Sequence, residues 1–434
     1  MIKFDESRFI KTTLGELVSK EKKSIISGPF GSNVGKRFFQ EEGIPLIRGN
    51  NLSKGQEKFK DEGFVFLTKE KANELNCYAI KNDLIFTAVG TIGQVGIIDE
   101  KLKFEEYVIS NKQLRARFDE SIITPLFAYY WFSSYWVQKL ILQRNVGSTV
   151  PLINLSVLKG LPITLPKSLK TQNNIVNVLE NISSKIAINN KINAALEAMA
   201  KTLYDYWFVQ FDFPDKNGKP YKSSEGKMIF NEELKREIPV GWESGTILDC
   251  AYLLGGGTPK KEISTYWNGE IPFFTPTDTE DNIFCLKTIL YTNELGISKS
   301  STKLFDKGTI LITARGTVGK INIAGKPMAM NQSCYALKPK TDFSSEFIYF
   351  HTNQIVKYLK AKSSGSIFKA IVTNDFKFTP TVVPDSEVVK LYSKKTTSMF
   401  ETVLNNKKQN QKLSELRDWL LPMLMNGQVR VGEK

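Results

Sequence analysis

The chain has 434 residues, which is enough for two or three domains with hydrophobic cores of their own. Its formal net charge of +14, from 59 basic and 45 acidic side chains, favours a polyanionic partner such as nucleic acid. The chain has no run of about 18 apolar residues, no apolar signal segment near its start and no Cys-x-x-Cys pair. We therefore expect a cytoplasmic protein without a membrane span, disulfide framework or zinc site.

Residues 1–166 alternate short apolar runs with glycine turns, which predicts a β-rich domain. The clearest example is Leu84-Ile-Phe-Thr-Ala88 followed by Val-Gly-Thr-Ile-Gly93, a pattern typical of a strand and a glycine turn. Gly31-Ser-Asn-Val-Gly-Lys36-Arg resembles a P-loop only superficially. Three residues separate its glycines, and Arg37 stands where Ser or Thr holds magnesium, so we predict a loop with a basic tip.

Residues 167–207 carry apolar side chains at alternating spacings of four and three, the heptad pattern of a helix that packs lengthwise on a partner. Two asparagines interrupt this row, which we call the first seam. Its members are Ile175, Leu179, Ile182, Ile186, Asn189, Asn193, Leu196, Ala200, Leu203 and Trp207. A helix from the first member to the last is about 48 Å long.

Residues 208–240 are rich in Pro and Gly, which predicts a surface connector or a small hairpin. Residues 241–384 are again β-rich and echo the first block. Ala314-Arg-Gly-Thr-Val-Gly319 answers Ala88–Gly93, and residues 365–384 answer residues 147–166 in their Gly-Ser and Pro positions. The glycine-rich segment that begins at Gly255 lacks GxGxxG spacing, so it does not predict a nucleotide site.

Residues 385–425 contain a second seam, followed by a short tail over residues 426–434. Its members are Tyr392, Thr396, Met399, Val403, Asn406, Asn410, Leu413, Arg417, Leu420 and Leu424. Each follows its counterpart in the first seam by 217 residues, so the chain is an internal duplication of a domain and its helix. Thr396 and Arg417 weaken the apolar stripe of this copy.

Buried asparagines in a heptad seam reduce stability and serve to fix register or orientation. Both seams carry an asparagine pair near the middle of the helix. We predict that the helices pack antiparallel, centre against centre, so that Asn189, Asn193, Asn406 and Asn410 meet. This arrangement relates the two β-rich domains by a pseudo-twofold axis and makes the overall class α+β. Separate packing of each helix on its own domain is the alternative.

Catalytic motifs are missing from the sequence. The single histidine, His351, lies in a helical context that predicts a structural role, and neither HExxH nor GxSxG occurs. The chain has no Pro-Pro, which excludes the Asn- or Asp-Pro-Pro-aromatic motif of amino-methyltransferases. The inventory indicates a recognition protein without cofactor, metal or catalytic residues.

The chain resembles the DNA-specificity subunit of type I restriction–modification systems over nearly its whole length. The segments that carry this resemblance are Gly28-Pro-Phe-Gly-Ser32, the Gly-Ser to Pro-x-x-x-Pro runs before both helices, Tyr206-Trp-Phe-Val-Gln-Phe-Asp-Phe-Pro214, Lys219-Pro-Tyr-Lys-Ser-Ser and Ile238-Pro-Val-Gly-Trp-Glu243. The tail after the second helix, Asn426-Gly-Gln-Val-Arg-Val, is shorter than the segment after the first.

The resemblance implies two target-recognition domains, each reading one half of a split double-stranded DNA target. It implies that the two helices form an antiparallel coiled coil that sets the gap and docks two methyltransferase (modification) subunits. Motor-nuclease (restriction) subunits are further expected partners. It also implies that this chain is not itself an enzyme.

Base readout needs polar side chains on loops, supported by phosphate contacts. The DNA-binding candidates of the first domain are Ser32, Asn33, Lys36, Arg37, Arg48, Asn50, Asn51, Lys112, Gln113 and Ser148. Those of the second are Thr258, Lys260, Lys261, Thr277, Arg315, Asn331, Gln332, Ser366 and Lys369. The helix-pairing candidates are Ile186, Asn189, Asn193, Leu196, Val403, Asn406, Asn410 and Leu413.

Two other interpretations stay open at the level of sequence. One is an anti-restriction or scaffold protein that uses the same helices without reading DNA. The other is a stand-alone enzyme such as a nuclease, although no carboxylate cluster favours it.

Overall fold

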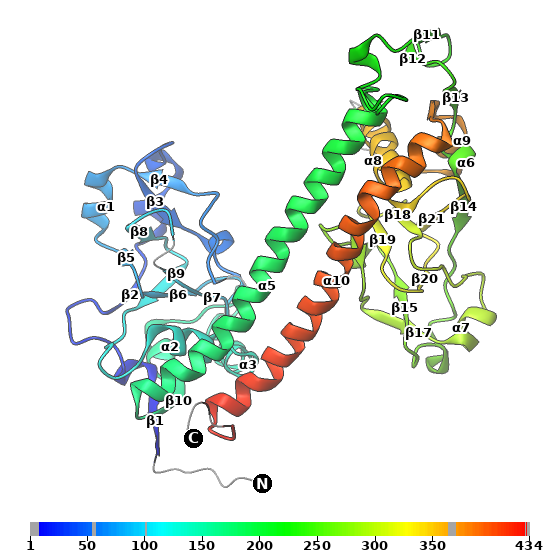
Figure 1. Ribbon diagram of the computed structural model, residues 1–434. Coiled ribbons are helices and arrows are strands. Elements are labelled where there is room, and N and C mark those ends of the chain that lie inside the picture. Colours follow the sequence, from blue (N-terminus) through cyan, green and yellow to red (C-terminus); the bar gives the residue numbers. More distant parts are fainter. Residues whose placement is uncertain (1–7, 54–57, 100–101, 363–369, 430, 432–434) are drawn as a thin grey trace. The chain divides into compact units, whose positions relative to one another are not determined.

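The computed structural model describes residues 8–53, 58–99, 102–362, 370–429 and 431. The chain forms two compact units, one of residues 1–187 with 412–434 and one of residues 188–411. Each unit contains a β-rich domain and part of each of the two long helices (Figure 1). In the described part of the chain, no helix has the length and apolar character needed to cross a bilayer.

The first unit, as far as it is described, builds its domain from two four-stranded sheets with the strand orders β2-β9-β6-β7 and β4-β3-β8-β5. The strands are β1 (Phe9–Thr13), β2 (Ile25–Ser27), β3 (Ile44–Ile47), β4 (Val65–Leu67), β5 (Tyr78–Ile80), β6 (Leu84–Thr87), β7 (Val95–Ile97), β8 (Glu106–Ile109), β9 (Gln113–Ala116) and β10 (Pro162–Pro166). The helices are α1 (Lys69–Leu75), α2 (Pro125–Phe132), α3 (Tyr135–Gln143) and α4 (Leu155–Lys159).

The described part of the second unit contains a sheet of order β14-β21-β18-β19-β16 and a sheet of order β17-β15-β20. Its strands are β13 (Glu243–Gly245), β14 (Ala251–Gly255), β15 (Ile271–Phe274), β16 (Phe284–Cys285), β17 (Leu290–Thr292), β18 (Ile310–Thr313), β19 (Ile321–Ala324), β20 (Ala329–Met330), β21 (Cys334–Pro339) and β22 (Thr381–Val383). Its helices are α6 (Ile247–Cys250), α7 (Glu294–Ser298), α8 (Ser345–Lys362) and α9 (Thr373–Phe378).

The central strands separate two cores because their side chains alternate between the faces of the sheet. In β6, Leu84 and Phe86 join one core and Ile85 the other. In β18, Ile310 and Ile312 likewise face one core, while Leu311 faces a second. Burial on both faces explains why these strands are continuous apolar runs in the sequence.

The two domains repeat one topology. The order β2-β9-β6-β7 recurs as β14-β21-β18-β19, and β4-β3-β8 recurs as β17-β15-β20 with the same parallel pair, β3 with β8 and β15 with β20. The two-stranded sheets beside the long helices also correspond. The first strand of each domain, β1 or β13, pairs with the strand that precedes the helix, β10 or β22. The duplicated α+β fold predicted from the sequence is confirmed.

The long helices are α5 (Leu169–Tyr204) and α10 (Ser386–Met425). Ser168 begins α5 by accepting the Thr171 N–H (3.4 Å), and Asp385 begins α10 by accepting the Glu387 N–H (2.8 Å). A π-helical turn, Asp205–Val209, extends α5. The connector that follows contains a hairpin of β11 (Met228–Asn231) and β12 (Arg236–Pro239).

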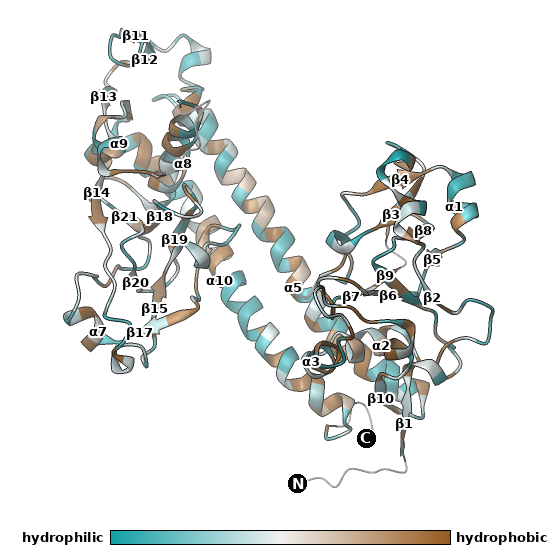
Figure 2. Ribbon diagram, turned by 180° about the vertical axis from the view of Figure 1, so that it is seen from behind, coloured by the Kyte–Doolittle hydropathy of each residue, from teal (hydrophilic) through white to brown (hydrophobic). Residues whose placement is uncertain are grey.

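Within the second unit, α5 and α10 pack antiparallel, because residue numbers fall along one helix as they rise along the other. Asn406 Nδ2 donates to Asn193 Oδ1 (2.9 Å), and the Tyr392 hydroxyl donates to the Ala200 carbonyl (3.0 Å). Figure 2 shows that the middle of α10 is largely hydrophilic, where the sequence runs Asn405-Asn-Lys-Lys-Gln-Asn-Gln411. Contact between the two helices along this stretch therefore depends on hydrogen bonds between polar side chains.

Candidate nucleic-acid interface

In the first domain, loops that lie far apart in the sequence meet at one edge of the sheets, where backbone hydrogen bonds connect them. These bonds run from the Gly28 N–H to the Gln113 carbonyl (2.9 Å), from the Ser110 N–H to the Ile47 carbonyl (3.1 Å), from the Ala88 N–H to the Lys112 carbonyl (2.7 Å) and from the Ile153 N–H to the Ala88 carbonyl (2.9 Å). They gather the loop after β2, the end of β3, the β8–β9 turn, the β6–β7 turn and the loop before α4.

The second domain gathers the equivalent loops in the same way. Its bonds run from the Gly257 N–H to the Met330 carbonyl (3.1 Å), from the Asn331 N–H to the Phe274 carbonyl (3.0 Å), from the Ala314 N–H to the Ser333 carbonyl (2.8 Å) and from the Ile371 N–H to the Ala314 carbonyl (3.0 Å). Each domain therefore presents one composite loop edge, which we call the first and the second loop edge.

Glycine is required where two of these loops touch. A Cβ on Gly28 would lie 1.9 Å from the Ser110 carbonyl oxygen, and a Cβ on Gly256 would lie 2.2 Å from the Asn331 carbonyl oxygen. Both approaches are closer than any side chain tolerates. The glycine therefore lets the loop after β2, and its counterpart after β14, lie directly on the neighbouring turn.

A buried polar side chain organises each loop edge. Asn51 is fully buried; its Oδ1 accepts the Arg48 N–H (2.9 Å), and its Nδ2 donates to the carbonyls of Lys60 (3.0 Å) and Glu62 (2.9 Å). Asp278 occupies the equivalent position and accepts the Thr275 N–H (2.8 Å). The Asn51 side chain is thus committed inside the domain and is not available to a ligand.

Gln113 is also fully buried, and its amide contacts the Ser110 hydroxyl. With the amide turned to satisfy its neighbours, it donates to the Ile47 carbonyl (3.1 Å) and accepts the Gly49 N–H (3.2 Å). Like Asn51, Gln113 is a buried side chain whose hydrogen bonds hold the loops of the first loop edge together.

The other candidates that fall within the described residues lie at or near the surface of the two loop edges. The exposed ones are Ser32, Asn33, Lys36, Arg37, Asn50, Lys112, Ser148, Lys260, Lys261, Thr277, Arg315 and Gln332. Arg48, Thr258 and Asn331 are half-buried; an Arg48 guanidinium nitrogen donates to the Gly63 carbonyl (3.2 Å), and Thr258 bonds to Gln332. Ser366 and Lys369 lie outside the described residues.

Sequence reasoning did not select Phe30, whose side chain is 84% exposed on the loop that carries Ser32 and Asn33. The signal was available, because Phe30 is the only large side chain in Gly28-Pro-Phe-Gly-Ser32.

The seam asparagines meet in cross-helix pairs. Asn189 Nδ2 donates to Asn410 Oδ1 (2.8 Å) and to Gln409 Oε1 (2.8 Å), and Asn410 Nδ2 donates to Asn190 Oδ1 (2.8 Å). Asn406 pairs with Asn193 in the next layer. Asn189 is fully buried, and among the described residues its Oδ1 has no hydrogen-bond partner.

The remaining seam positions follow ordinary packing. Ile186 and Val403 are buried, whereas Leu196 and Leu413 are half-buried. Thr396 is fully buried and its hydroxyl donates to the Tyr392 carbonyl (3.0 Å), which satisfies a polar group within the apolar stripe.

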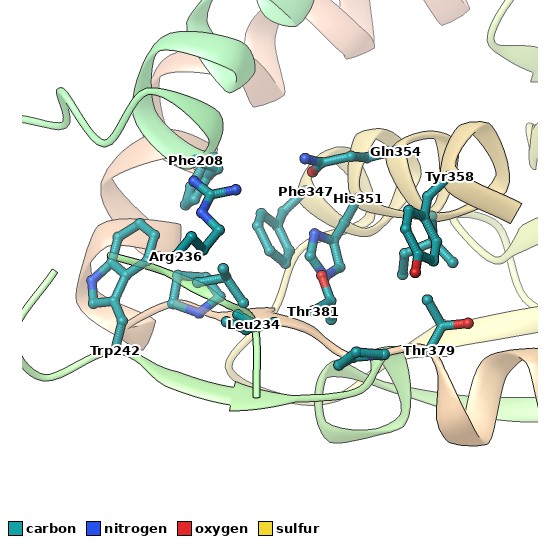
Figure 3. A pocket seen from close by; sticks show the side chains of 14 residues that line it. Phe208, Leu234, Arg236, Trp242, Phe347, His351, Gln354, Tyr358, Thr379 and Thr381 are labelled. Atoms are coloured by element: carbon teal, nitrogen blue, oxygen red, sulfur yellow. The ribbon is translucent and has the colours of Figure 1, made fainter. Parts of the chain in front are cut away.

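His351 lies at the wall of a pocket in the second unit, together with Phe347, Gln354 and Thr381 (Figure 3). Both of its ring nitrogens have partners, the Tyr204 hydroxyl at Nδ1 (3.0 Å) and the Thr381 hydroxyl at Nε2 (3.2 Å). Burial lowers the pKa of His351 to about 4, so the ring is neutral at pH 7. These contacts agree with the structural role predicted from the sequence.

Among the described residues, no group of three or more His, Cys, Asp or Glu side chains is arranged to hold a metal ion. The four cysteines all lie in the described part of the chain, and each is buried and free.

A β-rich domain and a long helix, repeated once, with a composite loop edge on each domain, define a duplicated recognition scaffold. The family described as the type I restriction modification DNA specificity domain matches this chain over residues 10–198 and 239–415. These segments make up most of the sequence, so the chain belongs to this family.

Two relatives agree with this assignment, and a solved structure shares the fold. The chain is 26% identical over 404 residues to the type I restriction enzyme HindI specificity subunit of Haemophilus influenzae, covering 80% of this chain and 87% of that protein. It is 26% identical over 446 residues to the MjaIX specificity subunit of Methanocaldococcus jannaschii, covering 100% and 99%. Its fold is similar to that of a type I restriction–modification S subunit from M. genitalium, with a TM-score of 0.56, 17% identity and coverage of 100% and 99%.

Proposed function

We propose that this chain is the DNA-specificity subunit of a type I restriction–modification complex and that each β-rich domain reads one half of a bipartite double-stranded target. The observation that carries this proposal is the repeated loop edge. Two domains with one topology gather equivalent loops, three of the four backbone bonds given for each edge join equivalent residues, and both edges carry exposed cations and amides. Such an edge supplies both kinds of contact that DNA recognition needs.

The exposed side chains divide by the contact that suits them. Lys36, Arg37 and Lys112 on the first loop edge, with Lys260 and Lys261 on the second, would contact phosphates and make binding weaken as salt rises. The amides of Asn33, Asn50 and Gln332 have both donors and acceptors for base edges, and the Arg315 guanidinium has donors for the acceptors of guanine. The Arg37 guanidinium lies 4.7 Å from the centre of the Phe38 ring, which holds it near the loop edge.

The paired helices supply the geometry of the complex in this proposal. α5 has 36 residues and α10 has 40. At a rise of about 1.5 Å per residue, each helix is longer than one turn of B-DNA, which is about 34–36 Å. We propose that they set the unread gap between the half-sites and that their outer faces dock two methyltransferase subunits, with motor-nuclease subunits joining the complex. This chain then contributes recognition and no catalytic group, and it acts in the cytoplasm.

The decisive experiment is co-expression with the cognate methyltransferase subunit, followed by genome-wide mapping of methylated adenines. We expect one bipartite motif with a fixed unread gap. Exchanging the loop around Arg48 for that of another family member should change one half of the motif only. Exchanging the loop around Arg315 should change only the other half.

The possible outcomes distinguish this function from the alternative functions. If residues 1–166 are replaced and the methylated sequence stays the same, the proposal is wrong. A stable complex that confers no methylation pattern favours a scaffold or anti-restriction protein. Metal-dependent cleavage of DNA by the isolated chain favours a stand-alone nuclease.

A further inference from the structure

Phe30 is the most exposed large apolar side chain described on the first loop edge. It is 84% exposed, although burying a phenylalanine ring ordinarily stabilises a fold by roughly 1.5–3 kcal/mol. Its neighbours Ser32, Asn33, Lys36 and Arg37 are exposed as well, and residues 28–40 contain no acidic side chain. An aromatic ring surrounded by donors and cations is suited to a polyanion that also has flat apolar surfaces.

The backbone beneath Phe30 is held firmly. Gly28 lies directly on the Ser110 carbonyl, and the Pro29 ring fixes its own φ and restricts Gly28 before it. On the other side the Asn33 N–H donates to the Phe30 carbonyl (2.9 Å), which closes a turn. Because these contacts already fix the loop backbone, the Phe30 ring can bind a partner without further ordering of the loop. Little conformational entropy is therefore lost on binding.

At the equivalent position, the described part of the second loop edge has no exposed aromatic side chain. Counting from the glycine that contacts the neighbouring turn, Phe30 corresponds to Thr258, which is half-buried and bonds to Gln332. The two edges are therefore built alike, but at this position the first presents an exposed phenylalanine and the second presents a half-buried threonine.

We propose that Phe30 inserts between two base pairs of the half-site read by the first domain, partly unstacking them and kinking the duplex there. Apolar wedges that unstack a base step kink DNA by about 20–90°. The second half-site stays stacked, so the two halves of the target are deformed unequally. This inference rests on the proposed function and specifies how its first domain contacts DNA.

The test uses the full chain assembled with its methyltransferase partner and a duplex of the mapped target. 2-Aminopurine replaces adenine at successive positions, and dyes at the duplex ends report bending by energy transfer. We expect emission to rise several-fold at one step of the first half-site and at none in the second. Phe30→Ala should abolish the rise and the bend and weaken binding about tenfold, whereas Phe30→Trp should retain them.

Phe378→Ala is the matched control, because this phenylalanine is 74% exposed in the other unit. It should change neither emission nor affinity. The proposal is overturned if Phe30→Ala binds with unchanged emission and affinity, or if that variant loses only its assembly with the methyltransferase. If the unaltered complex does not bind the duplex specifically, the proposed function itself is wrong, and this result is independent of any Phe30 variant.

Discussion

The two β-rich domains are alike in the buried side chains that hydrogen-bond to the loop backbone. They differ in the side chains at the tips of those loops. Asn51 and Asp278 occupy one position, and each presents an oxygen to the N–H three residues earlier, at 2.9 and 2.8 Å. Phe30 and Thr258 also occupy one position, yet one is exposed and the other is half-buried. The comparison teaches that an internal duplication retains the atoms that fold the loops, while the tips are left to diverge.

The largest effect is expected from removing the buried groups that organise the loop edges. Asn51→Leu leaves the Arg48 N–H and the carbonyls of Lys60 and Glu62 without the Asn51 amide, which should lower the free energy of unfolding by about 3 kcal/mol. Asp278→Leu should cost a similar amount, because Asp278 also accepts the Ile289 N–H (2.7 Å). Urea unfolding of the full chain measures both.

The reciprocal exchange tests whether the two positions are truly equivalent. Asn51→Asp keeps the acceptor for the Arg48 N–H but places a buried carboxylate oxygen against the carbonyls of Lys60 and Glu62, so its cost should equal or exceed that of Asn51→Leu. An exposed amide, Asn50→Leu, is the control and should change stability by less than about 0.5 kcal/mol. Equal costs for Asn50→Leu and Asn51→Leu would contradict the role given to the buried amide.

The second effect is a pH dependence confined to one domain. His351 corresponds in helix sequence to Trp131, and each ring nitrogen bonds to the last strand of its domain, Trp131 Nε1 to the Pro162 carbonyl (2.9 Å) and His351 Nε2 to Thr381 (3.2 Å). Only His351 titrates, with its pKa lowered from 6.5 to about 4. Between these values the unfolded chain binds a proton that the folded chain does not.

The free energy of unfolding should therefore fall as the pH drops below 6.5 and lose about 2 kcal/mol through His351 by pH 5, with no contribution above pH 6.5. Urea titrations at pH 7 and pH 5 measure this loss. Because carboxylates elsewhere titrate too, His351→Gln is the reference, and the difference between the two proteins isolates the ring. Parallel stability curves for both would rule out the neutral buried histidine.

A third effect concerns how each domain is held to its helix. In the first unit, Lys58 on a loop bonds to Glu180 of α5 (2.7 Å). In the second unit the direction is reversed, and Lys407 of α10 bonds to Glu280 (2.6 Å) and Asn282 (2.5 Å) in the domain. Both lysines are largely buried, so Lys58→Met and Lys407→Met should each cost about 1–2 kcal/mol in thermal or urea unfolding.

The control for these ion pairs is Lys390→Met. Lys390 bonds to Glu387 (2.8 Å), but both side chains are more than half exposed, and such a pair contributes less than about 0.5 kcal/mol. If Lys390→Met costs as much as Lys407→Met, burial is not what makes the domain contacts strong.

Periodicity was enough to predict the duplication, the strands around Leu84 and Ile310, and both long helices, because those features follow from side chains near in sequence. It did not separate Asn50, which is exposed, from Asn51, which is buried, because the carbonyls that bind Asn51 lie on a segment about ten residues away. Partners supplied by tertiary packing, like those of Asn51, are not visible in a spacing pattern. Thr396 is different, because its hydroxyl bonds to the carbonyl four residues earlier in its own helix; only its burial depends on the packing of that helix.

The smallest effect on stability is expected where the two seams meet. Asn189 bonds to Asn410, and Asn193 bonds to Asn406, so a variant that changes Asn189 and Asn406 together leaves an unmatched asparagine in each pair. Asn189→Leu with Asn410→Leu replaces this pair by apolar groups, and the amide oxygens of Gln409 and Asn190 that also lose a donor belong to exposed residues, where water can replace it. Since the Asn189 Oδ1 lacks a partner among the described residues, stability should rise or change by less than about 1 kcal/mol.

The informative readout for this pair is register. If the asparagines hold the helices in one alignment, the double leucine variant should keep its stability but give methylated motifs with more than one gap length, whereas Asn410→Leu alone should lose about 1–2 kcal/mol. Motif mapping beside urea unfolding distinguishes these results. A double variant with a single unchanged gap would show that the β-rich domains, and not the polar layer between the helices, determine the alignment.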